Sequence, residues 1–324
     1  MSGLGGRIGR QVVALLATLL AVSVLSFLLT SLLPGDPAVA ILGPSGITQQ
    51  SLASARRALG LDHPLVQRYW DWLGNVVHGN LGSSFITHIS VSSELRQHLP
   101  VTLELIVLAT IFSVVLAIPF GIWSGYRAGR ADDRIISLLA FAGLAVPTFV
   151  VALMLILVCA VDLHWLPASG WVPLTQSPWQ NFRSALLPAL ALALPQMAVN
   201  VRVLRSDVAA TMQSDFVTFA VAKGLPLRKI LFRHAFRPSS LSFVTVMGLQ
   251  IGFLLGGTVI VENLFSLPGI GQMLVQSILS RDLITVQGLT LFIATGFVVI
   301  NFVVDLAYSL IDPRIRRGRN IATV

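Results

Sequence analysis

Six long apolar stretches alternate with polar segments along the chain of 324 residues. A helix that crosses a bilayer needs roughly 17–25 predominantly apolar residues. Because each stretch is that long, the pattern predicts an all-α membrane protein with six transmembrane helices. We expect these helices near residues 11–33, 101–123, 135–161, 185–204, 241–261 and 286–311. The first stretch exceeds the ~7–15-residue apolar core of a signal peptide, so we expect it to be retained.

The polar segments between these stretches differ in their content of arginine and lysine. Basic residues gather before the first stretch, between the second and third, between the fourth and fifth, and after the sixth. The two shorter loops on the opposite side carry only Arg183 and Arg281 as basic residues. Because cytoplasmic loops hold the excess of basic residues in membrane proteins, we expect both termini and the segment between the fourth and fifth stretches in the cytoplasm.

A long segment, residues 34–100, would then lie outside the cytoplasm. It predicts two short helices, one at 49–59 closed by Gly60 and one that begins at Pro64 and ends near Gly79. The expected domain organisation has four parts. Residues 1–33 form a cytoplasmic N-terminus and the first membrane helix, and residues 34–100 form an extracytoplasmic loop with small helices. Residues 101–311 form a core of five membrane helices that includes a cytoplasmic loop at 206–239, and residues 312–324 form a cytoplasmic tail.

The loop between the fourth and fifth stretches is longer than a simple connection requires. Phe216, Phe219 and Ala220 have the spacing i, i+3 and i+4, which predicts a short helix with one apolar face. Gly224 followed by Pro226 should end this helix. The small residues around the glycine would let another protein surface approach the backbone closely, so the loop has the features of a docking element.

The second half of the same loop is basic. Lys229, Arg233 and Arg237 recur at every fourth position and predict one basic stripe. An ordinary cytoplasmic loop that obeys the positive-inside rule would also be basic. The fixed order of small-residue helix, glycine and proline favours docking over that simpler interpretation.

Composition supports a membrane protein and excludes several other classes. Hydrophobic residues make up 55% of the chain and charged residues only 11%, with a mean hydropathy of +0.81, whereas soluble domains carry about 25% charged residues. The net charge of +8 does not indicate nucleic-acid binding, because the basic residues lie between apolar spans rather than on one soluble face. A single cysteine, Cys159, excludes a disulfide framework, and the six histidines lack the spacing of metal ligands.

No segment fits the phosphate-binding pattern Gly-x-x-x-x-Gly-Lys-Ser/Thr. No Ser-His-Asp or Cys-His arrangement is visible either. We therefore predict that the chain is not an enzyme. If ATP drives its activity, hydrolysis takes place on another chain.

Three blocks of sequence resemble the permease subunits of binding-protein-dependent ABC importers, most closely their peptide and nickel branch. The first block is Ala-x-x-Lys-Gly-Leu at 220–225, with His-Ala at 234–235, and it is similar to the coupling loop of that family. The second combines 59–65 with 79–85, and the third is 261–271. With the end of the sixth stretch, which also resembles the family, the likeness covers nearly the whole chain.

The resemblance implies the type I ABC importer permease architecture in a bacterial inner membrane. It implies a homologous permease as the partner in a heterodimer, two cytoplasmic ATP-binding subunits that hold ATP and Mg²⁺, and an external solute-binding protein; this chain would bind no cofactor itself. In that family the coupling helix would act as a lever that moves the fourth and fifth spans. The corresponding residues here are Asp215, Phe216, Phe219, Ala220, Ala222, Lys223, Gly224, Leu225, Arg233, His234 and Arg237.

Four charged residues fall within or at the ends of apolar spans, where a charge costs about 2.5–3.5 kcal/mol on insertion scales. Arg202 and Asp305 lie at similar depths of the fourth and sixth spans, so they could form a structural pair. Glu104 and Glu262 lie at the outer ends of the second and fifth spans. Exposure at the interface explains these two glutamates, although either could attract the amino terminus of an incoming peptide at a gate.

Two classes of transporter fit the pattern. The first is an ABC permease subunit that carries di- or oligopeptides, or nickel, a sugar or another small solute. The second is a self-contained secondary transporter or channel, which would need coupling-ion ligands near the midplane and often an internal repeat. The sequence shows neither of these features, so it favours the ABC permease.

Overall fold

The computed structural model describes residues 2–31, 48–58 and 62–311, and these residues are almost entirely helical. Apart from one isolated antiparallel bridge between Ser83 and Ser90, the described part contains no β-structure, which confirms the all-α prediction. In chain order the helices are α1 (Ser2–Ser31), α3 (Gln49–Ala58), α4 (Leu65–Val77), α5 (Val91–Tyr126), α6 (Ala131–Ala145), α7 (Thr148–Leu155), α8 (Pro178–Met212), α9 (Asp215–Ala222), α10 (Leu227–Lys229), α11 (Arg237–Leu264), α12 (Ile270–Leu279) and α13 (Leu283–Ile311), with π-helical segments at Ile156–Asp162 and Ile230–Phe236.

Within the described residues, five helices are long and apolar enough to cross a membrane, and the pair α6 and α7 makes a sixth if it counts as one span. The third predicted span is therefore not one straight helix. The chain bends by 102° between α6 and α7, where Pro147 caps the second helix with a φ of −59° and a ψ of 142°. Proline disfavours helical geometry at the residue before it, so Val146 is extended and the helix ends there. Gly60 and the tail 312–324 lie outside the described residues.

The chain forms two compact units, which are described separately. The first unit comprises Met1–Thr102 and Pro268–Val298, and the second comprises Leu103–Leu267 and Val299–Val324. Helices α5 and α13 therefore contribute residues to both. The segment that begins at Pro268 groups with the first part of the chain, and the predicted domain organisation, which divides the chain by its position relative to the membrane, stays a prediction.

In the first unit, the aromatic helix α4 packs on α1. The Phe27 ring lies 5.5 Å from the ring of Tyr69 and 5.7 Å from that of Trp72. The hydroxyls of Tyr69 and Ser23 are 2.8 Å apart and share a hydrogen bond. These contacts confirm the predicted helix after Pro64 and show that its Tyr69 and Trp72 face is held against the first membrane helix.

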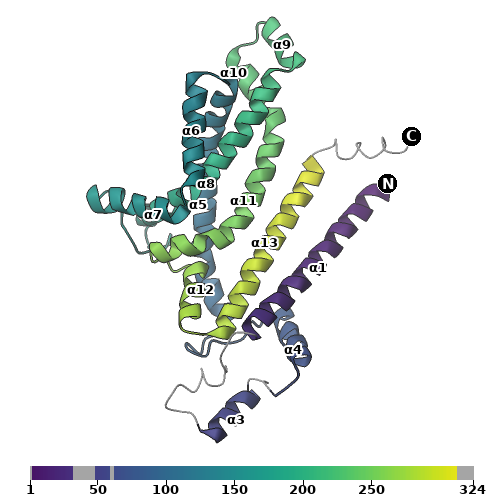
Figure 1. Cartoon of the computed structure of the whole chain (residues 1–324), viewed down its shortest axis with the longest axis vertical. Coiled ribbons are helices and arrows are strands. Elements are labelled where there is room, and N and C mark those ends of the chain that lie inside the picture. Colours follow the sequence, from purple (N-terminus) through teal and green to yellow (C-terminus); the bar gives the residue numbers. More distant parts are fainter. Residues whose placement is uncertain (1, 32–47, 59–61, 312–324) are drawn as a thin grey trace. The chain divides into compact units, whose positions relative to one another are not determined.

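In the second unit, α8 is the central helix. It packs against α6, α7 and α11 (Figure 1), and 67% of its most apolar window is buried, more than in any other candidate span of the described part. Ser177 caps its start by accepting a hydrogen bond from the backbone of Gln180. The two internal prolines that the sequence places in this span, Pro188 and Pro195, are accommodated within the helix.

Close approach of α5 and α8 depends on glycine. A Cβ atom built on Gly121 would lie 2.8 Å from the Cβ of Leu204, and one on Gly125 would lie 2.7 Å from the Cβ of Val208. Such distances leave no room for a side chain. Glycine also permits close contact between α11 and α13, because a Cβ atom on Gly248 would lie 2.6 Å from the Cγ1 of Val304.

Candidate functional site

The predicted docking helix is present as α9, which follows the end of α8 after a short turn (Figure 1). Ser214 precedes the helix in an extended conformation, and its carbonyl accepts hydrogen bonds from the backbones of Val217 and Thr218. Asp215 lies in the first turn, where a negative charge stabilises the helix through its interaction with the macrodipole. These backbone hydrogen bonds and this charge therefore define the first turn of α9.

One side of α9 is anchored and the other is free. Val217 and Ala220 are 1% and 4% exposed and pack with Ile230 of the following π-helical segment. Phe216 and Phe219 are 49% and 61% exposed. The prediction that Phe216, Phe219 and Ala220 form one apolar face is thus wrong in one respect, because Ala220 points toward the protein while the two phenylalanines point away from it.

The end of α9 matches the prediction closely. Gly224 has a φ of +72°, a left-handed conformation that ends a helix and that glycine adopts without strain. Its N–H donates to the carbonyl of Val221, and the N–H of Leu225 donates to the carbonyl of Ala220. Lys223 lies with its ammonium group 4.5 Å from the centre of the Phe219 ring, a cation–π contact. The outward side of α9 is therefore an aromatic surface that carries one positive charge.

The basic half of the loop continues this surface. Lys229, Arg233 and Arg237 are all exposed, and His234 is half-buried. A shallow pocket of about 460 Å³ is lined by Pro226, Arg228, Lys229 and Phe232. We call the exposed set Phe216, Phe219, Lys223, Arg228, Lys229 and Phe232 the loop surface; it combines aromatic rings with cations and suits an acidic, partly apolar groove.

A buried ion pair that sequence reasoning did not find lies near the same end of the bundle. Asp133, on the first turn of α6, has a side chain that is 3% exposed, and Arg205 of α8 contacts both of its carboxylate oxygens. The Nε of Arg205 donates to Oδ1 at 2.7 Å and its Nη2 donates to Oδ2 at 2.8 Å. This bidentate geometry is the strong form of an arginine–carboxylate pair.

Further donors complete the environment of Asp133. Ser124 of α5 donates to Oδ1 at 2.5 Å, and the backbone N–H of Gly129 donates to Oδ2 at 2.7 Å. Because its donors come from α5, the α5–α6 loop, α6 and α8, the carboxylate joins three helices. We call Asp133 with Arg205 and Ser124 the carboxylate clamp. Its only sequence signal is an acidic residue at the start of a helix, and that signal does not identify a partner 72 positions away.

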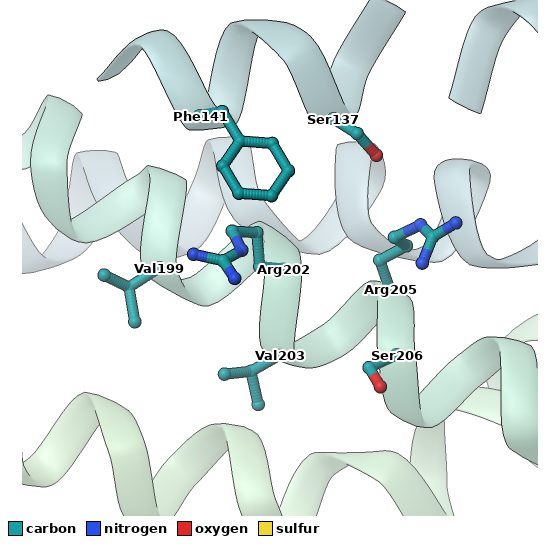
Figure 2. A pocket seen from close by; sticks show the side chains of 7 residues that line it. All are labelled: Ser137, Phe141, Val199, Arg202, Val203, Arg205 and Ser206. Atoms are coloured by element: carbon teal, nitrogen blue, oxygen red, sulfur yellow. The ribbon is translucent and has the colours of Figure 1, made fainter. Parts of the chain in front are cut away.

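The predicted pair of Arg202 and Asp305 stays a prediction, because the side chain of Asp305 lies outside the described residues. Arg202 is exposed and its guanidinium lies 4.5 Å from the centre of the Phe141 ring. Figure 2 shows Arg202 between Phe141 of α6 and Val199 of α8, at one end of a pocket whose other end holds Arg205 and Ser137.

The two predicted gate residues differ in environment. Glu104 of α5 is half-buried and is hydrogen-bonded to the side chain of Asn181 on α8, which also donates to the carbonyl of Val172 at 3.0 Å. Glu262 of α11 is fully buried, at 0% exposure. Exposure at the interface therefore does not explain Glu262, and that part of the prediction is wrong. Within the described residues, no group of His, Cys, Asp or Glu could hold a metal ion.

A second buried polar contact also escaped the sequence analysis. Asn200 of α8 is 0% exposed and donates to the Ser113 hydroxyl of α5 at 3.0 Å. Its carbonyl oxygen has no hydrogen-bond partner. A buried amide oxygen without a partner is costly in a membrane interior.

Comparison with known proteins gives consistent matches along the chain. Residues 117–317 match the family described as binding-protein-dependent transport system inner membrane component, and residues 7–106 match the N-terminal part of such membrane components. A putative peptide transport system permease protein of Brucella abortus is 39% identical over 307 residues, which cover 95% of this chain and 98% of that protein.

Two further relatives are similar over nearly their whole length. A probable peptide ABC transporter permease protein of Sinorhizobium fredii is 37% identical over 315 residues, covering 97% of this chain and 100% of the relative. A glutathione transport system permease protein of Salmonella choleraesuis is 36% identical over 307 residues, covering 95% and 97%. With its apolar helices and these matches, the chain belongs to the family of inner membrane components of binding-protein-dependent transport systems.

Proposed function

We propose that the chain is the permease subunit through which an ABC importer moves short peptides across the inner membrane. The membrane-embedded permease class follows from the family, and in this class ATP hydrolysis belongs to a separate subunit. The peptide substrate is supported by relatives named for peptide transport and for transport of glutathione, which is itself a tripeptide.

The observation that carries the mechanism is the divided surface of α9. Its inner side is anchored through Val217 and Ala220, and its outer side presents Phe216 and Phe219 to solvent. A helix held firmly on one side and apolar on the other fits a groove on a partner protein. We assign that partner as the ATP-binding subunit, in which ATP-driven closure would push α9 and bias the permease between an inward-open and an outward-open state.

The same proposal fixes the expected assembly. The loop surface and both chain termini face the cytoplasm, as the basic loops indicate. The permease pairs with a homologous permease, two ATP-binding subunits attach on the cytoplasmic side, and a solute-binding protein delivers the peptide from outside. Residues 34–100 then form part of the external face and 101–311 form the permease core.

A coupling assay on the reconstituted transporter tests the role of α9. Phe219→Ala removes an exposed ring without disturbing the packing of Val217 and Ala220. Because rings at the centre of an interface carry much of its binding energy, we expect both peptide-stimulated ATP hydrolysis and peptide uptake to fall by about tenfold or more. Thr218→Ala is the matched control, because Thr218 is also exposed on α9 but carries no aromatic ring.

Gly224 provides a second test of the same surface. A Cβ atom at Gly224 meets nothing within 4 Å, so a tryptophan there would extend into the space of a docked partner. The φ of +72° strains any side chain at this position, and Gly224→Asn controls for that strain. Gly224→Asn keeps a residue that tolerates the left-handed conformation and should retain transport, whereas Gly224→Trp should abolish it. Normal uptake by Gly224→Trp would overturn the docking role, and uptake driven by a proton gradient without ATP would overturn the ABC mechanism.

A further inference from the structure

Three exposed aromatic side chains gather around the N-terminal end of α8, the end opposite to α9. Trp179 and Phe182 belong to the first two turns of α8 and are 68% and 37% exposed. Trp165 lies in the segment between α7 and α8 and is 64% exposed. We call Trp165, Trp179 and Phe182 the aromatic cluster. The proposed coupling mechanism assigns no role to these side chains.

The aromatic cluster is held in a fixed arrangement. The rings of Trp179 and Phe182 stack, with their centres 6.1 Å apart and their planes inclined by 23°. The Nη2 of Arg183 donates to the carbonyl of Trp165 at 2.8 Å, and the N–H of Trp165 donates to the carbonyl of Cys159 at 2.9 Å. Trp165 is therefore tied both to α8 and to the π-helical segment after α7. A surface fixed in this way loses little conformational entropy when it is covered.

The length of α8 gives the depth of the cluster in the bilayer. The apolar stretch 185–204 ends directly before Arg205, which marks the boundary on the cytoplasmic side. Trp179 precedes Arg205 by 26 residues and Phe182 precedes it by 23, which are roughly 39 Å and 35 Å at the rise of an α-helix. A helix tilt of about 20° reduces these depths by only about 2 Å. A bilayer has a hydrocarbon core about 30 Å thick and measures about 40–45 Å with its headgroup regions, so both rings lie in the outer headgroup region.

The order of the side chains along this end of α8 matches the order of polarity in a lipid leaflet. Phe182 has a purely apolar ring and lies nearer to the hydrocarbon core. Trp179 carries an indole N–H and lies nearer to the water, and Arg183 adds a positive charge whose long apolar stem can lie along the core while its guanidinium reaches the headgroups. Tryptophan is enriched at this depth because its ring is amphipathic.

The exposed apolar surface continues from the cluster onto the helix before it. The 15 residues of α6 rise roughly 22 Å, so the bend of 102° after them falls within the hydrocarbon core, and α7 runs nearly at right angles to α6 (Figure 1). Beyond the bend, Leu153, Leu157 and Val161 are 48%, 50% and 51% exposed. A surface at that depth is covered from within the membrane. The aromatic cluster forms its outer edge, and this continuity favours lipid over a soluble protein as the occupant.

We propose that the aromatic cluster binds the headgroup region of the outer leaflet and anchors the N-terminal end of α8 at a fixed depth. The ligand is the layer of glycerol, ester carbonyl and phosphate groups, to which the indole N–H groups of Trp165 and Trp179 donate. The mechanical consequence rests on the proposed coupling function. Because α9 adjoins the other end of α8, an anchored outer end converts a push on α9 into a tilt of α8 and prevents a shift along the membrane normal.

Fluorescence quenching in vesicles tests the depth of the two indoles. The purified transporter complex is reconstituted into phosphatidylcholine that is brominated either near the headgroup or near the ends of the acyl chains. The emission that Trp165→Phe or Trp179→Phe lacks, relative to the parent protein, reports the missing indole. We expect this emission to be quenched strongly by bromine near the headgroup, and weakly by bromine at the chain ends and by iodide in the water. These measurements need no transport activity, so they remain valid if the proposed function is wrong.

Two results of the quenching experiment would overturn the anchor. Strong quenching by iodide without quenching by brominated lipid would place the cluster in water and indicate a docking site for a soluble protein. Quenching by neither would mean that the second permease covers the cluster. Both variants keep an aromatic ring at the substituted position, so the fold should be retained, and recovery of the assembled complex checks this.

The mechanical consequence has its own test. A double variant, Trp165→Leu with Trp179→Leu, keeps apolar side chains and removes both indoles. We expect it to hydrolyse ATP like the parent protein and to import fewer peptides per ATP. Leu174→Ala is the matched control, because Leu174 is 57% exposed in the same segment but lies outside the cluster. An unchanged ratio of uptake to hydrolysis in the double variant would overturn the anchor as a pivot, whereas failure of the proposed function would appear as normal transport by Phe219→Ala.

Discussion

Replacement of Arg205 by methionine isolates the contribution of the carboxylate clamp. Arg205→Met keeps an unbranched, extended side chain and removes its charge, so the buried carboxylate of Asp133 loses both of its hydrogen bonds to the guanidinium. Breaking a buried ion pair by removal of one partner typically costs about 3–5 kcal/mol. Here the cost should be smaller, because the side chain of Arg205 is 36% exposed and Asp133 keeps its bonds from Ser124 and Gly129.

We therefore expect a loss of about 2 kcal/mol, after reduction for solvent screening of the exposed guanidinium. For a domain of 150–250 residues that loss would lower the Tm by about 4–8 °C. Because the sensitivity falls with chain length, we expect a shift at or below the lower end of this range. The measurement is a thermal-denaturation series on the purified complex in detergent, read as the fraction that still elutes at its native size. Arg134→Met is the control, since Arg134 is exposed on the same helix next to Asp133.

A double-mutant cycle completes this test. Asp133→Asn and Arg205→Met should each destabilise the protein, and the double variant should lose less than the sum of the two, because both remove the same pair. Two results would refute the stabilising role of the clamp. One is a Tm of Arg205→Met within about 1 °C of that of Arg134→Met, and the other is a double variant whose loss equals the sum of the losses of Asp133→Asn and Arg205→Met. Either result would mean that the ion pair contributes about as little as an exposed surface pair.

Three further variants have definite expectations. Gly125→Ala should destabilise the protein by about 1–3 kcal/mol because its Cβ would overlap Val208, whereas Gly256→Ala, where nothing lies within 4 Å, should melt like the parent protein. The carboxylate of Asp282 accepts hydrogen bonds from Ser84 and Thr285. Asp282→Asn weakens this acceptor and should loosen the segment around Ser84, so chymotrypsin should cleave more at Phe85. Unchanged cleavage would show that these hydrogen bonds do not hold the segment in place. If the buried Glu262 contacts the peptide amino terminus, Glu262→Gln should weaken uptake of a free dipeptide but not of its N-acetylated form, and an equal effect on both would assign Glu262 to structure.

Local patterns predicted the elements, and they did so because the physical cause is local. Each apolar stretch was long enough to span a bilayer, so its position followed from length alone. Gly224 was identified as a helix end because a residue that tolerates positive φ commonly ends a helix in that way, and its φ is +72°. The third apolar stretch was long enough for one span, but Pro147 ends the first helix at Val146 and the chain bends there by 102°, so length alone did not describe this span.

The contacts that assemble these elements could not be predicted in the same way. The apolar periodicity of α9 shows which residues share a face, but it does not show which face packs against the rest of the protein. The buried face of α9 packs on Ile230, which lies beyond the end of the helix. Asp133 could have paired with any of the arginines in its own loop. It pairs with Arg205 because Gly121 and Gly125 let α8 approach α5 closely enough to place that side chain, and a contact between distant glycines leaves no periodic signal in one sequence.

The contacts around α8 add two helices to the expected lever. The turn from α8 into α9 is short, with the backbones of Gln213 and Ser214 hydrogen-bonded to the last turn of α8, so a push on α9 acts directly on α8. The hydrogen bonds of the carboxylate clamp connect α8 to α5 and α6. At Gly121 and Gly125, α5 and α8 are in direct van der Waals contact. We infer that α5 and α6 move with α8 as one rigid body when α9 is pushed. The lever through the fourth and fifth spans stays a prediction, and α11 also packs against α8. A rigid body transmits a small displacement without loss because packed interiors resist compression. In that arrangement the clamp is as much a part of coupling as α9, since a loosened α6 would absorb the displacement before it reached the substrate path.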